Sequence, residues 1–376
     1  MADVVVVGGG VIGCATAYHL TAAGATVTVL ERGEIGGEAS GAAAGMLAPL
    51  SESPRPGPFV ELCLASLRLF PALADALREE TGIDIEYLPS GILRVAQTEH
   101  EERELHHRLE WQRPLGLPLE WVDGEALRRL EPRLAPARGA LYSPQEHQVS
   151  AGRLTQALAQ AAARRGAVIQ QGVAVTGLLA DGRQVVGVGT SAGRVSGGQV
   201  VLAAGPWTAA FGRRLGVPLP VRPVRGQMLA FADFAPGGRS LPPYGRSLRH
   251  IVWGEAAYLV PKANGFLFVG ATVEDVGFRS GTTVRGQSAL RRSARSLVPS
   301  LAHSKIASSW AALRPGSPDG LPILGPVPGW DGLSVAGGHY RNGILLAPIT
   351  GRLMAQLLTE GKTEVSLAPF SAGRFG

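Results

Sequence analysis

The hydrophobic pattern at the start of the chain predicts a strand, a helix and a second strand in close succession. Residues 4–7 are four consecutive valines, as expected for a parallel strand that is buried on both faces. A helical segment follows over residues 14–23, and a second run rich in β-branched residues covers 26–30. This order predicts a βαβ unit, which is the building block of an α/β fold.

Strand and helix patterns continue to the C-terminus. Residues 59–81 predict an amphipathic helix, and the highly charged segment 99–112 predicts a helix exposed to solvent. The helix predicted over 153–165 follows Ser150, which is a suitable N-cap residue. Further helices are predicted over 284–297 and from about 349 to 359, and strands around Ile85 and over 91–96, 168–179, 185–188, 199–204, 227–231, 257–260, 266–269 and 332–336.

Composition narrows the class of protein. With 376 residues, 45% of them hydrophobic and 18% charged, the chain is long enough for two globular domains. Two cysteines, Cys14 and Cys63, exclude a disulfide scaffold and lack zinc-site spacing, and the adjacent His106 and His107 are expected at the surface. The net charge of +6 comes from scattered arginines and only three lysines, which argues against nucleic-acid binding. Since no signal peptide or membrane span is evident, we expect a cytoplasmic enzyme.

A glycine pattern joins the first strand to the first helix. In Gly8-x-Gly10-x-x-Gly13, the first glycine permits a tight turn, the second lets a pyrophosphate approach the backbone, and the third lets helix and strand pack closely. The N-terminus of the helix then faces the phosphates. Glu31, at the end of the second strand, can accept hydrogen bonds from ribose hydroxyls. The sequence therefore predicts an adenine dinucleotide site.

Distant small-residue turns favour FAD over NAD as this dinucleotide. Turns rich in glycine and alanine occur at 36–47, 203–207 and 337–343, far from the first fingerprint. A long cofactor with a flavin ring needs such distributed backbone contacts, whereas an NAD site is normally completed within one compact half. A second apparent fingerprint, Gly187-x-Gly189-x-x-Ala192, leads into a turn and a strand rather than a helix, so we interpret it as hairpin turns.

Several motifs spread over the whole chain carry a family resemblance. They are the fingerprint with Glu31, SGAAAGML at 40–47, VRGQ at 224–227, YLVP at 258–261, FVGAT at 268–272, LRPGSPDGLPILG at 313–325 and GGHYRNGILLAPITG at 337–351. In these motifs the chain resembles the glycine oxidases of the thiazole-biosynthesis type, within the D-amino acid oxidase family of flavoproteins. One departure is Val273, which stands where the best-known relatives carry methionine above the ring.

This resemblance implies an α/β fold of the D-amino acid oxidase and p-hydroxybenzoate hydroxylase type. It would combine a Rossmann-like FAD-binding domain (1–83, 145–220 and 310–376) with an antiparallel-sheet substrate domain (84–144 and 221–309). FAD would be bound non-covalently, and relatives often form tetramers. The cofactor contacts that we expect, from the fingerprint and the resemblance together, are Gly8, Gly10, Val11, Ile12, Gly13, Glu31, Arg32, Ser40, Ala43, Gly45, Met46, Leu47, Val175, Ala204, Gly205, Trp207, Arg314, His339, Arg341, Asn342, Gly343, Ile344 and Leu345.

Arg314 is the candidate for binding the substrate carboxylate. It follows an apolar run, 310–313, and we expect it beside a rigid Pro315-Gly316 turn, from which its guanidinium would grip a carboxylate with two hydrogen bonds. The resemblance implies that Tyr258 adds a hydroxyl to the same carboxylate and that Arg341 lies at the flavin edge near the substrate. From the residues alone, a surface position for Arg314 is the alternative, although the apolar run before it favours a pocket, and Tyr258 could equally be a core tyrosine.

The implied reaction is oxidative deamination of glycine or another small amino acid. A hydride would pass from Cα to flavin N5, water would convert the imino acid to glyoxylate and ammonia, and O2 would yield peroxide. No residue is needed as an acid or base, and no metal is expected. Within the same family, an oxidase or dehydrogenase for sarcosine, proline or a D-amino acid, with another electron acceptor, is the alternative. Two other classes of protein remain as alternatives. One is an FAD protein that needs a partner subunit or a quinone acceptor, and the other is a non-catalytic binding module.

Overall fold

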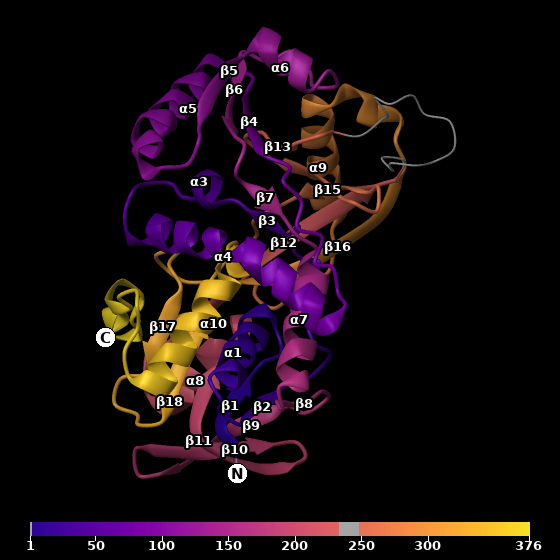
Figure 1. The fold of residues 1–376 in the computed structure, drawn as a ribbon. Helices are drawn as coiled ribbons and strands as arrows, with labels where there is room; N and C mark the ends of the chain where they lie inside the picture. The colour runs from indigo at the N-terminus through magenta and orange to yellow at the C-terminus, as the bar shows by residue number, and fades with distance from the viewer. Residues whose placement is uncertain (1, 233–247) are drawn as a thin grey trace.

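A computed structural model describes residues 2–232 and 248–376 and contains two large sheets (Figure 1). The first has the strand order β17-β18-β11-β1-β2-β8, in which β1, β2, β8, β11 and β18 run parallel and β17 runs antiparallel to β18. The valines of β1 are buried on both faces, as their sequence predicts. The strands are β1 Ala2–Val7, β2 Val27–Leu30, β8 Val168–Gln170, β11 Gly193–Leu202, β17 Ile323–Pro326 and β18 Leu333–Gly337, with β9 Val175–Asp181 and β10 Gln184–Thr190 as an antiparallel extension of β11.

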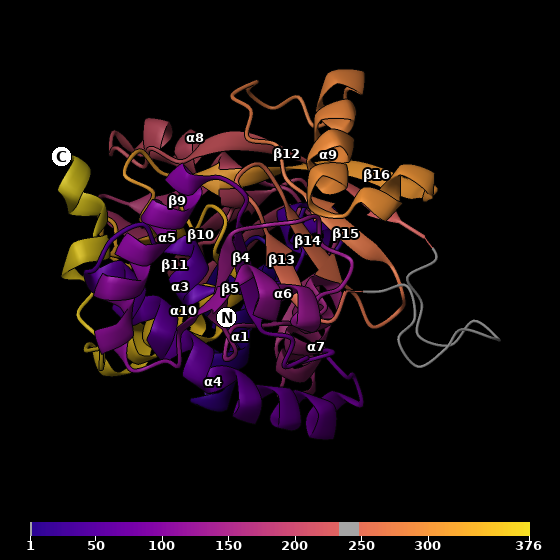
Figure 2. The ribbon, with the colours of Figure 1, turned by 90° about the horizontal axis from the view of Figure 1, so that it is seen from above.

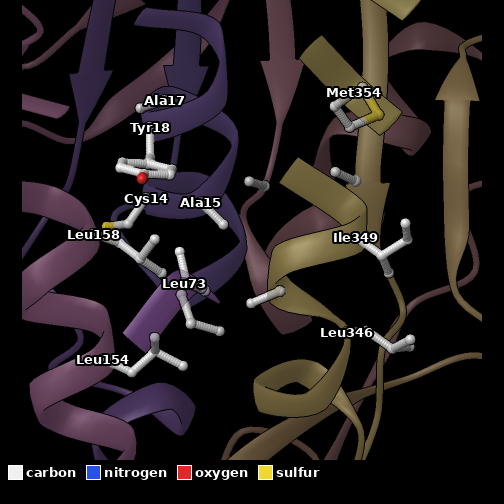
Figure 3. Close-up of a cluster of buried hydrophobic side chains, with 14 of the residues drawn as sticks. Cys14, Ala15, Ala17, Tyr18, Leu73, Leu154, Leu158, Leu346, Ile349 and Met354 are labelled. Carbon is white, nitrogen blue, oxygen red and sulfur yellow. The ribbon is translucent and has the colours of Figure 1, made fainter. Parts of the chain in front are cut away.

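Four helices pack together beside this sheet and form the largest core. They are α1 (Val11–Ala22), α4 (Pro58–Thr81), α7 (Ala151–Arg164) and α10 (Gly343–Glu360). Small residues let the helices approach: a Cβ on Gly351 of α10 would lie 2.5 Å from the carbonyl oxygen of Ala15 in α1. Figure 3 labels one buried residue of this core from each helix: Ala15, Leu73, Leu158 and Ile349.

The second sheet has the order β16-β12-β15-β14-β13-β4-β6-β5 and is antiparallel except for the pair β13 and β4. Its strands alternate with helices that cover it in the upper half of Figure 1. The elements are β4 Ile92–Ala96, β5 Glu120–Asp123, β6 Gly139–Ser143, β12 Arg222–Phe231, β13 Ile251–Trp253, β14 Tyr258–Pro261, β15 Leu267–Gly270, β16 Ile306–Gly316, α5 Glu99–Gln112, α6 Gly124–Leu130 and α9 Val284–Leu297. The predicted fold class, a parallel-sheet domain joined to an antiparallel sheet, is confirmed.

Short elements complete the chain between the two sheets. Seen from above in Figure 2, α4 and α7 lie along one edge of the molecule, and β12, α8 and α9 lie along the opposite edge. The short elements are α2 Ala39–Ala42, β3 Met46–Leu47, α3 Pro49–Glu52, β7 His147–Gln148 and α8 Thr208–Leu215, with 3-10 turns at Arg113–Leu115, Gly205–Trp207, Pro299–His303, Ala368–Phe370 and Ala372–Phe375. Among the described residues, no helix is long and apolar enough to cross a bilayer.

Two predicted helices have the boundaries that the sequence indicates, because local caps define their first residues. The side chain of Thr98 accepts a hydrogen bond from the Glu101 backbone, and the Glu101 carboxylate accepts one in return, which starts α5 at Glu99. Thr283 likewise accepts from the backbone of Gly286 and starts α9. Ser150 is the N-cap residue of α7, as the sequence suggests, but its side chain makes no capping hydrogen bond.

Other boundaries are corrected by tertiary contacts. Ile85 belongs to no strand; it is fully buried among the helices, and its carbonyl accepts from the backbone of Ser150. The single strand predicted over 168–179 is two strands, β8 and β9, that pair with different neighbours. The last helix begins at Gly343 rather than near residue 349, with Pro348 inside it.

The strand β16 also changes the expected local structure around Arg314. Pro315 and Gly316 are paired with β12 as the end of a strand, so the predicted rigid turn is wrong. The predicted domain boundary at residue 310 falls inside β16, which belongs to the second sheet along its whole length. The remaining division into two domains stays a prediction, and residues 233–247 of its second part lie outside the described residues.

Candidate functional site

A cavity of about 530 Å³ is lined by residues of both sheets and by the turns that follow their strands. Its volume lies within the range of about 300–1,000 Å³ that is typical of small-molecule sites. Most residues that the sequence predicts for cofactor or substrate binding meet here, although they come from opposite ends of the chain. The predicted residues in its wall are Gly8, Gly10, Val11, Ile12, Glu31, Arg32, Ser40, Ala43, Gly45, Met46, Val175, Ala204, Gly205, Trp207, Tyr258, Arg314, His339, Arg341, Asn342, Gly343 and Ile344.

The glycine fingerprint forms one end of the cavity. Gly8 has φ +111°, and a Cβ there would lie 2.4 Å from the carbonyl oxygen of Ala203. Gly13 lies outside the lining, where a Cβ would come within 1.9 Å of the Gly8 oxygen. Gly10 is the N-cap of α1 and has no side chain to cap the helix. Apart from the Val11 N–H, which donates to Ser40 Oγ over 2.9 Å, this helix end offers backbone donors suited to an anion.

Glu31 is held at the cavity wall by two backbone donors. Its Oε2 accepts from Gly9 N over 2.7 Å and its Oε1 accepts from Gly33 N over 2.8 Å. Each carboxylate oxygen keeps a further lone pair for a ligand hydroxyl. Next to it, the guanidinium of Arg32 lies 3.5 Å from the centroid of the Trp207 ring. This end therefore combines an acceptor, a stacked aromatic face and the Val175 strand, as a ribose and an adenine require.

The N-terminus of α10 meets the same cavity from the other side. Asn342 is its N-cap without a side-chain hydrogen bond, and Gly343 and Ile344 line the wall. Two predicted contacts, Leu47 and Leu345, are buried in the core and lie outside the cavity lining. Their cofactor role, like that of Gly13, stays a prediction.

His339 lies in the wall but is not an acid or base at neutral pH. It is 2% exposed, and its Nε2 lies 3.0 Å from Thr350 Oγ1. Burial lowers the pKa of the imidazole to about 3, so the ring is neutral at pH 7.

This lowered pKa predicts a pH-dependent difference in stability. Because the unfolded state takes up a proton near pH 6.5 and the folded state resists it, the stabilisation by His339 is present above pH 6.5 and is lost as pH falls toward 3. The free energy of unfolding can be measured in urea at pH 7 and at pH 4.5. Between these two pH values, the wild type should lose about 2 kcal/mol more of its free energy of unfolding than His339→Asn loses. The exposed His107→Asn should show no such difference from the wild type, and an equal difference for both variants would contradict the assignment.

Three predicted substrate residues come together: Arg314 and Tyr258 from the second sheet, and Arg341 from the segment between β18 and α10. Arg314 on β16 donates from Nη1 to the carbonyl oxygen of Thr272 over 3.0 Å. The Tyr258 hydroxyl lies 3.4 Å from Met228 Sδ. Burial raises the pKa of Tyr258, although the positive charges of Arg314 and Arg341 act to lower it. The phenol therefore stays protonated and can donate a hydrogen bond to an anion. The arrangement presents two guanidinium groups and a hydroxyl to one region, which suits a carboxylate.

The side chain of Arg314 occupies its position because Gly226 on β12, two residues from its strand partner Val224, has no side chain. A Cβ on Gly226 would lie 2.2–2.3 Å from the guanidinium atoms of Arg314. Gly270 has the same function for its neighbours, since a Cβ there would lie 2.5 Å from the Tyr258 hydroxyl. These two glycines belong to the VRGQ and FVGAT motifs, and both make room for the side chains of Arg314 and Tyr258.

Arg341 is paired with a residue that sequence reasoning missed. Its Nε donates to both carboxylate oxygens of Glu52, over 3.0 and 2.9 Å, and the two side chains are 19% and 11% exposed. This pairing raises the pKa of Arg341, which is charged at any ordinary pH. Other missed lining residues include Glu38, Ala174, Phe211, Arg214, Met228 and Tyr340; a lone acid or apolar residue in such segments carries no recognisable signal.

A second cavity of about 510 Å³ shares Tyr258 and Arg341 with the first. Val273, the departure noted in the sequence, is 59% exposed and lines this second cavity rather than the first. Its small side chain, with Ala256 and Ala289 nearby, leaves room beside the substrate groups.

Cysteine and metal chemistry find no support in the described part of the chain. Burial raises the pKa of Cys14 to about 12, and Cys63 is also fully buried, so both thiols stay protonated. Within residues 2–232 and 248–376, no three His, Cys, Asp or Glu side chains are grouped to hold a metal ion.

Comparison with known proteins gives matches over nearly the whole chain. A family model described as "FAD dependent oxidoreductase" (DAO) matches residues 3–357. A glycine oxidase of Geobacillus kaustophilus is 41% identical over 376 residues, which cover 99% of this chain and 97% of that protein. The crystal structure of glycine oxidase from the same organism has a TM-score of 0.93, covering 99% of this chain and 98% of that one at 40% identity. A bifunctional protein ThiO/ThiG of Synechocystis is 38% identical over 99% of this chain and 54% of its own length.

Proposed function

The chain belongs to the DAO family of FAD-dependent oxidoreductases, and we propose that it is an oxidase that converts glycine, oxygen and water to glyoxylate, ammonia and hydrogen peroxide. The single observation that carries the proposal is the meeting of Arg314, Tyr258 and Arg341 in one wall of a cavity whose other end is the glycine fingerprint. A dinucleotide at one end and a small anion at the other is the arrangement that amino-acid oxidation requires.

The residues present fit a non-covalently bound FAD. We infer that the uncapped helix end at Gly10 to Ile12 holds the pyrophosphate, and that Glu31 accepts the ribose hydroxyls. The close approach of Gly8 to Ala203 leaves no space for a side chain there. The N-terminus of α10, at Asn342 and Gly343, would supply backbone donors and a positive helix end to the flavin ring.

The substrate carboxylate is proposed to bind Arg314, with Tyr258 donating a second hydrogen bond. A guanidinium can bind a carboxylate through two parallel hydrogen bonds, which orients the substrate as well as holding it. Arg341, already paired with Glu52, would contribute a fixed positive charge at the edge of this site. Because the carboxylate is fixed and only Cα and the amine remain free, a small substrate can bind in one orientation.

When bound, FAD supplies the oxidising power by accepting a hydride from the substrate Cα. The protein contributes orientation and electrostatics. Neither Tyr258, whose pKa is raised, nor His339, neutral above pH 3, is placed to take a proton at neutral pH. The amine is therefore expected to lose its proton to solvent before the oxidation step, and the imino acid to be hydrolysed after it.

We also propose that the reaction serves thiamine thiazole synthesis, as the sequence resemblance implies. A homo-oligomer, with a tetramer as the expected state, and a cytoplasmic location remain predictions. Light scattering with size-exclusion chromatography tests the oligomer, and a monomer at micromolar concentration would contradict it.

A second candidate is an oxidase or dehydrogenase of the same family acting on sarcosine, proline or a D-amino acid. The observation that favours it is the second cavity beside Tyr258 and Arg341, walled by Val273 and Ala256, which has room for a substituent on the nitrogen or on Cα. A dehydrogenase would pass its electrons to an acceptor other than O2.

The purified protein should be yellow, and glycine should bleach the flavin absorbance under anaerobic conditions. Comparing glycine, sarcosine, D-alanine and D-proline ranks the substrates, and admitting air should restore the colour with formation of peroxide. A folded, colourless protein that takes up no FAD would refute the cofactor. Bleaching by bulky D-amino acids alone would favour the second candidate, and slow reoxidation in air would favour a dehydrogenase.

A further inference from the structure

The helix α3 (Pro49–Glu52) is too short to be stable by its own hydrogen bonds, and a buried carboxyl group holds its start. Oε1 of Glu146 accepts from the backbone N–H groups of Leu50 and Ser51, over 2.7 and 2.9 Å. Its Oε2 accepts from the Ser51 hydroxyl over 2.6 Å. Glu146 is fully buried and precedes β7, 94 residues after Glu52 in the chain. Three donors of one short helix thus depend on one distant side chain.

Side chains of α5 and of β4 in the second sheet donate to the carbonyl groups of the same segment. Gln112 Nε2 donates to the Leu50 oxygen over 2.7 Å, and Arg94 Nη1 donates to the Ser51 oxygen over 2.5 Å. Burial raises the pKa of Glu146 to about 7, while its three hydrogen bonds and the charge of Arg94 act in the opposite direction. Hydrogen bonds therefore hold both the N–H groups and the carbonyl groups of this segment, which restricts its backbone.

The far end of α3 delivers Glu52 to the substrate site. Its carboxylate accepts from Arg341 Nε, and the guanidinium of Arg341 lies 5.9 Å from the centroid of the Tyr258 ring and 5.4 Å from that of Trp253. Both Glu52 and Arg341 line the main cavity, whereas Glu146 does not. A shift of α3 would move Glu52, and with it the charge that Arg341 offers to a ligand.

We propose that Glu146 is a positioning residue for substrate binding: by holding α3 it fixes Glu52, and through Glu52 it fixes Arg341 at the cavity. The role of Arg341 toward an amino-acid substrate rests on the proposed function. The positioning of Arg341 by Glu146 is independent of the proposed function, because it concerns only contacts within the protein.

The chain offers a matched control in Glu131. This carboxyl group is 2% exposed, and its Oε1 also accepts from two backbone N–H groups, those of Arg249 and His250, over 2.7 and 2.8 Å. It follows α6 and lines neither cavity. Glu131→Gln and Glu146→Gln therefore make the same change to a buried acceptor, one carboxylate oxygen replaced by an amide NH2 group, but only Glu146 supports α3.

The test measures the melting temperature, FAD content, the kcat and KM for glycine, and the Kd for glycolate, the hydroxy analogue of glycine, for the holoenzymes. Both variants should melt at lower temperature. Glu146→Gln should raise the KM and the glycolate Kd about tenfold with a smaller change in kcat, because misplaced binding groups weaken the complex. Glu131→Gln should leave both constants within about twofold of the wild type. Equal constants for the two variants would overturn the proposal.

Two further measurements keep the proposal testable. If Glu146→Gln does not fold, Ser51→Ala can be used instead, because it removes only the hydroxyl contact. It should raise the glycolate Kd by a smaller factor. Crystal structures of wild type and variant should show the Glu52–Arg341 pair lost or displaced; an unmoved pair would overturn the proposal whatever the substrate. A wild-type protein that binds neither glycine nor glycolate would refute the proposed function, while a displaced pair would still support the positioning role.

Discussion

Replacing Arg314 with alanine should weaken substrate binding by about 2–4 kcal/mol, which is roughly a 30- to 900-fold rise in Kd. The loss is large because the guanidinium is the group best placed to make two charge-assisted hydrogen bonds to a carboxylate. It is half-buried on β16 above Gly226, and its Nη1 is already oriented by the Thr272 carbonyl. Anaerobic titration of the flavin with glycine measures the change directly.

Two controls separate this effect from a general loss of charge. Arg314→Lys keeps the charge but not the two-pronged geometry, and should recover only part of the affinity. Arg222→Ala removes a nearby arginine of β12 whose side chain is 59% exposed and paired with Asp275, and should change the affinity little. Unchanged affinity in Arg314→Ala would place the carboxylate site elsewhere.

Gly8→Ala should give a protein that retains less than about a tenth of its FAD and unfolds at markedly lower temperature. The residue has φ +111°, which L side chains rarely adopt, and its Cβ would lie 2.4 Å from the Ala203 oxygen. To relieve that contact, β1 must separate from the turn after β11, and both line the cavity. Bound flavin per protein and the melting temperature are the measurements.

Gly193→Ala is the matched control for this prediction. Gly193 has φ +120°, but nothing lies within 4 Å of a Cβ there, so the substitution carries the cost of backbone strain without the clash. We expect it to lower the melting temperature slightly and to leave the FAD content unchanged. Equal loss of FAD in both variants would show that strain, rather than closeness to Ala203, explains the effect.

Local features of the sequence were reliable where neighbouring residues make the interactions. The boundaries of α5 and α9 follow from caps that lie within four residues of each helix start. The glycine fingerprint acts within one βαβ unit, so its role could be recognised without the rest of the fold. In both cases the partners are close in the chain, and side-chain type is enough to identify them.

Features that depend on distant partners were missed or misplaced. Ile85 is of a residue type that favours strands, but it is buried in the core formed by the helices, far along the chain from its partners. The sequence predicts a turn at Pro315-Gly316 because proline and glycine usually end strands, but pairing with β12 keeps both residues in β16. Glu52 and Glu146 gave no signal, since an isolated acid in a loop is usually solvated.

The sequence by itself thus determined the class of cofactor, the order of the elements and the family, because each of these depends on local spacing or on motifs. Only the tertiary structure decided which charged side chains are paired with one another. It brought Glu52, Glu146 and Arg341, up to 289 residues apart, into one network, and it packed the guanidinium of Arg314 against Gly226. The physical reason is that the free energy of a buried charge depends on the partners around it, and those partners meet only when the two sheets close on each other.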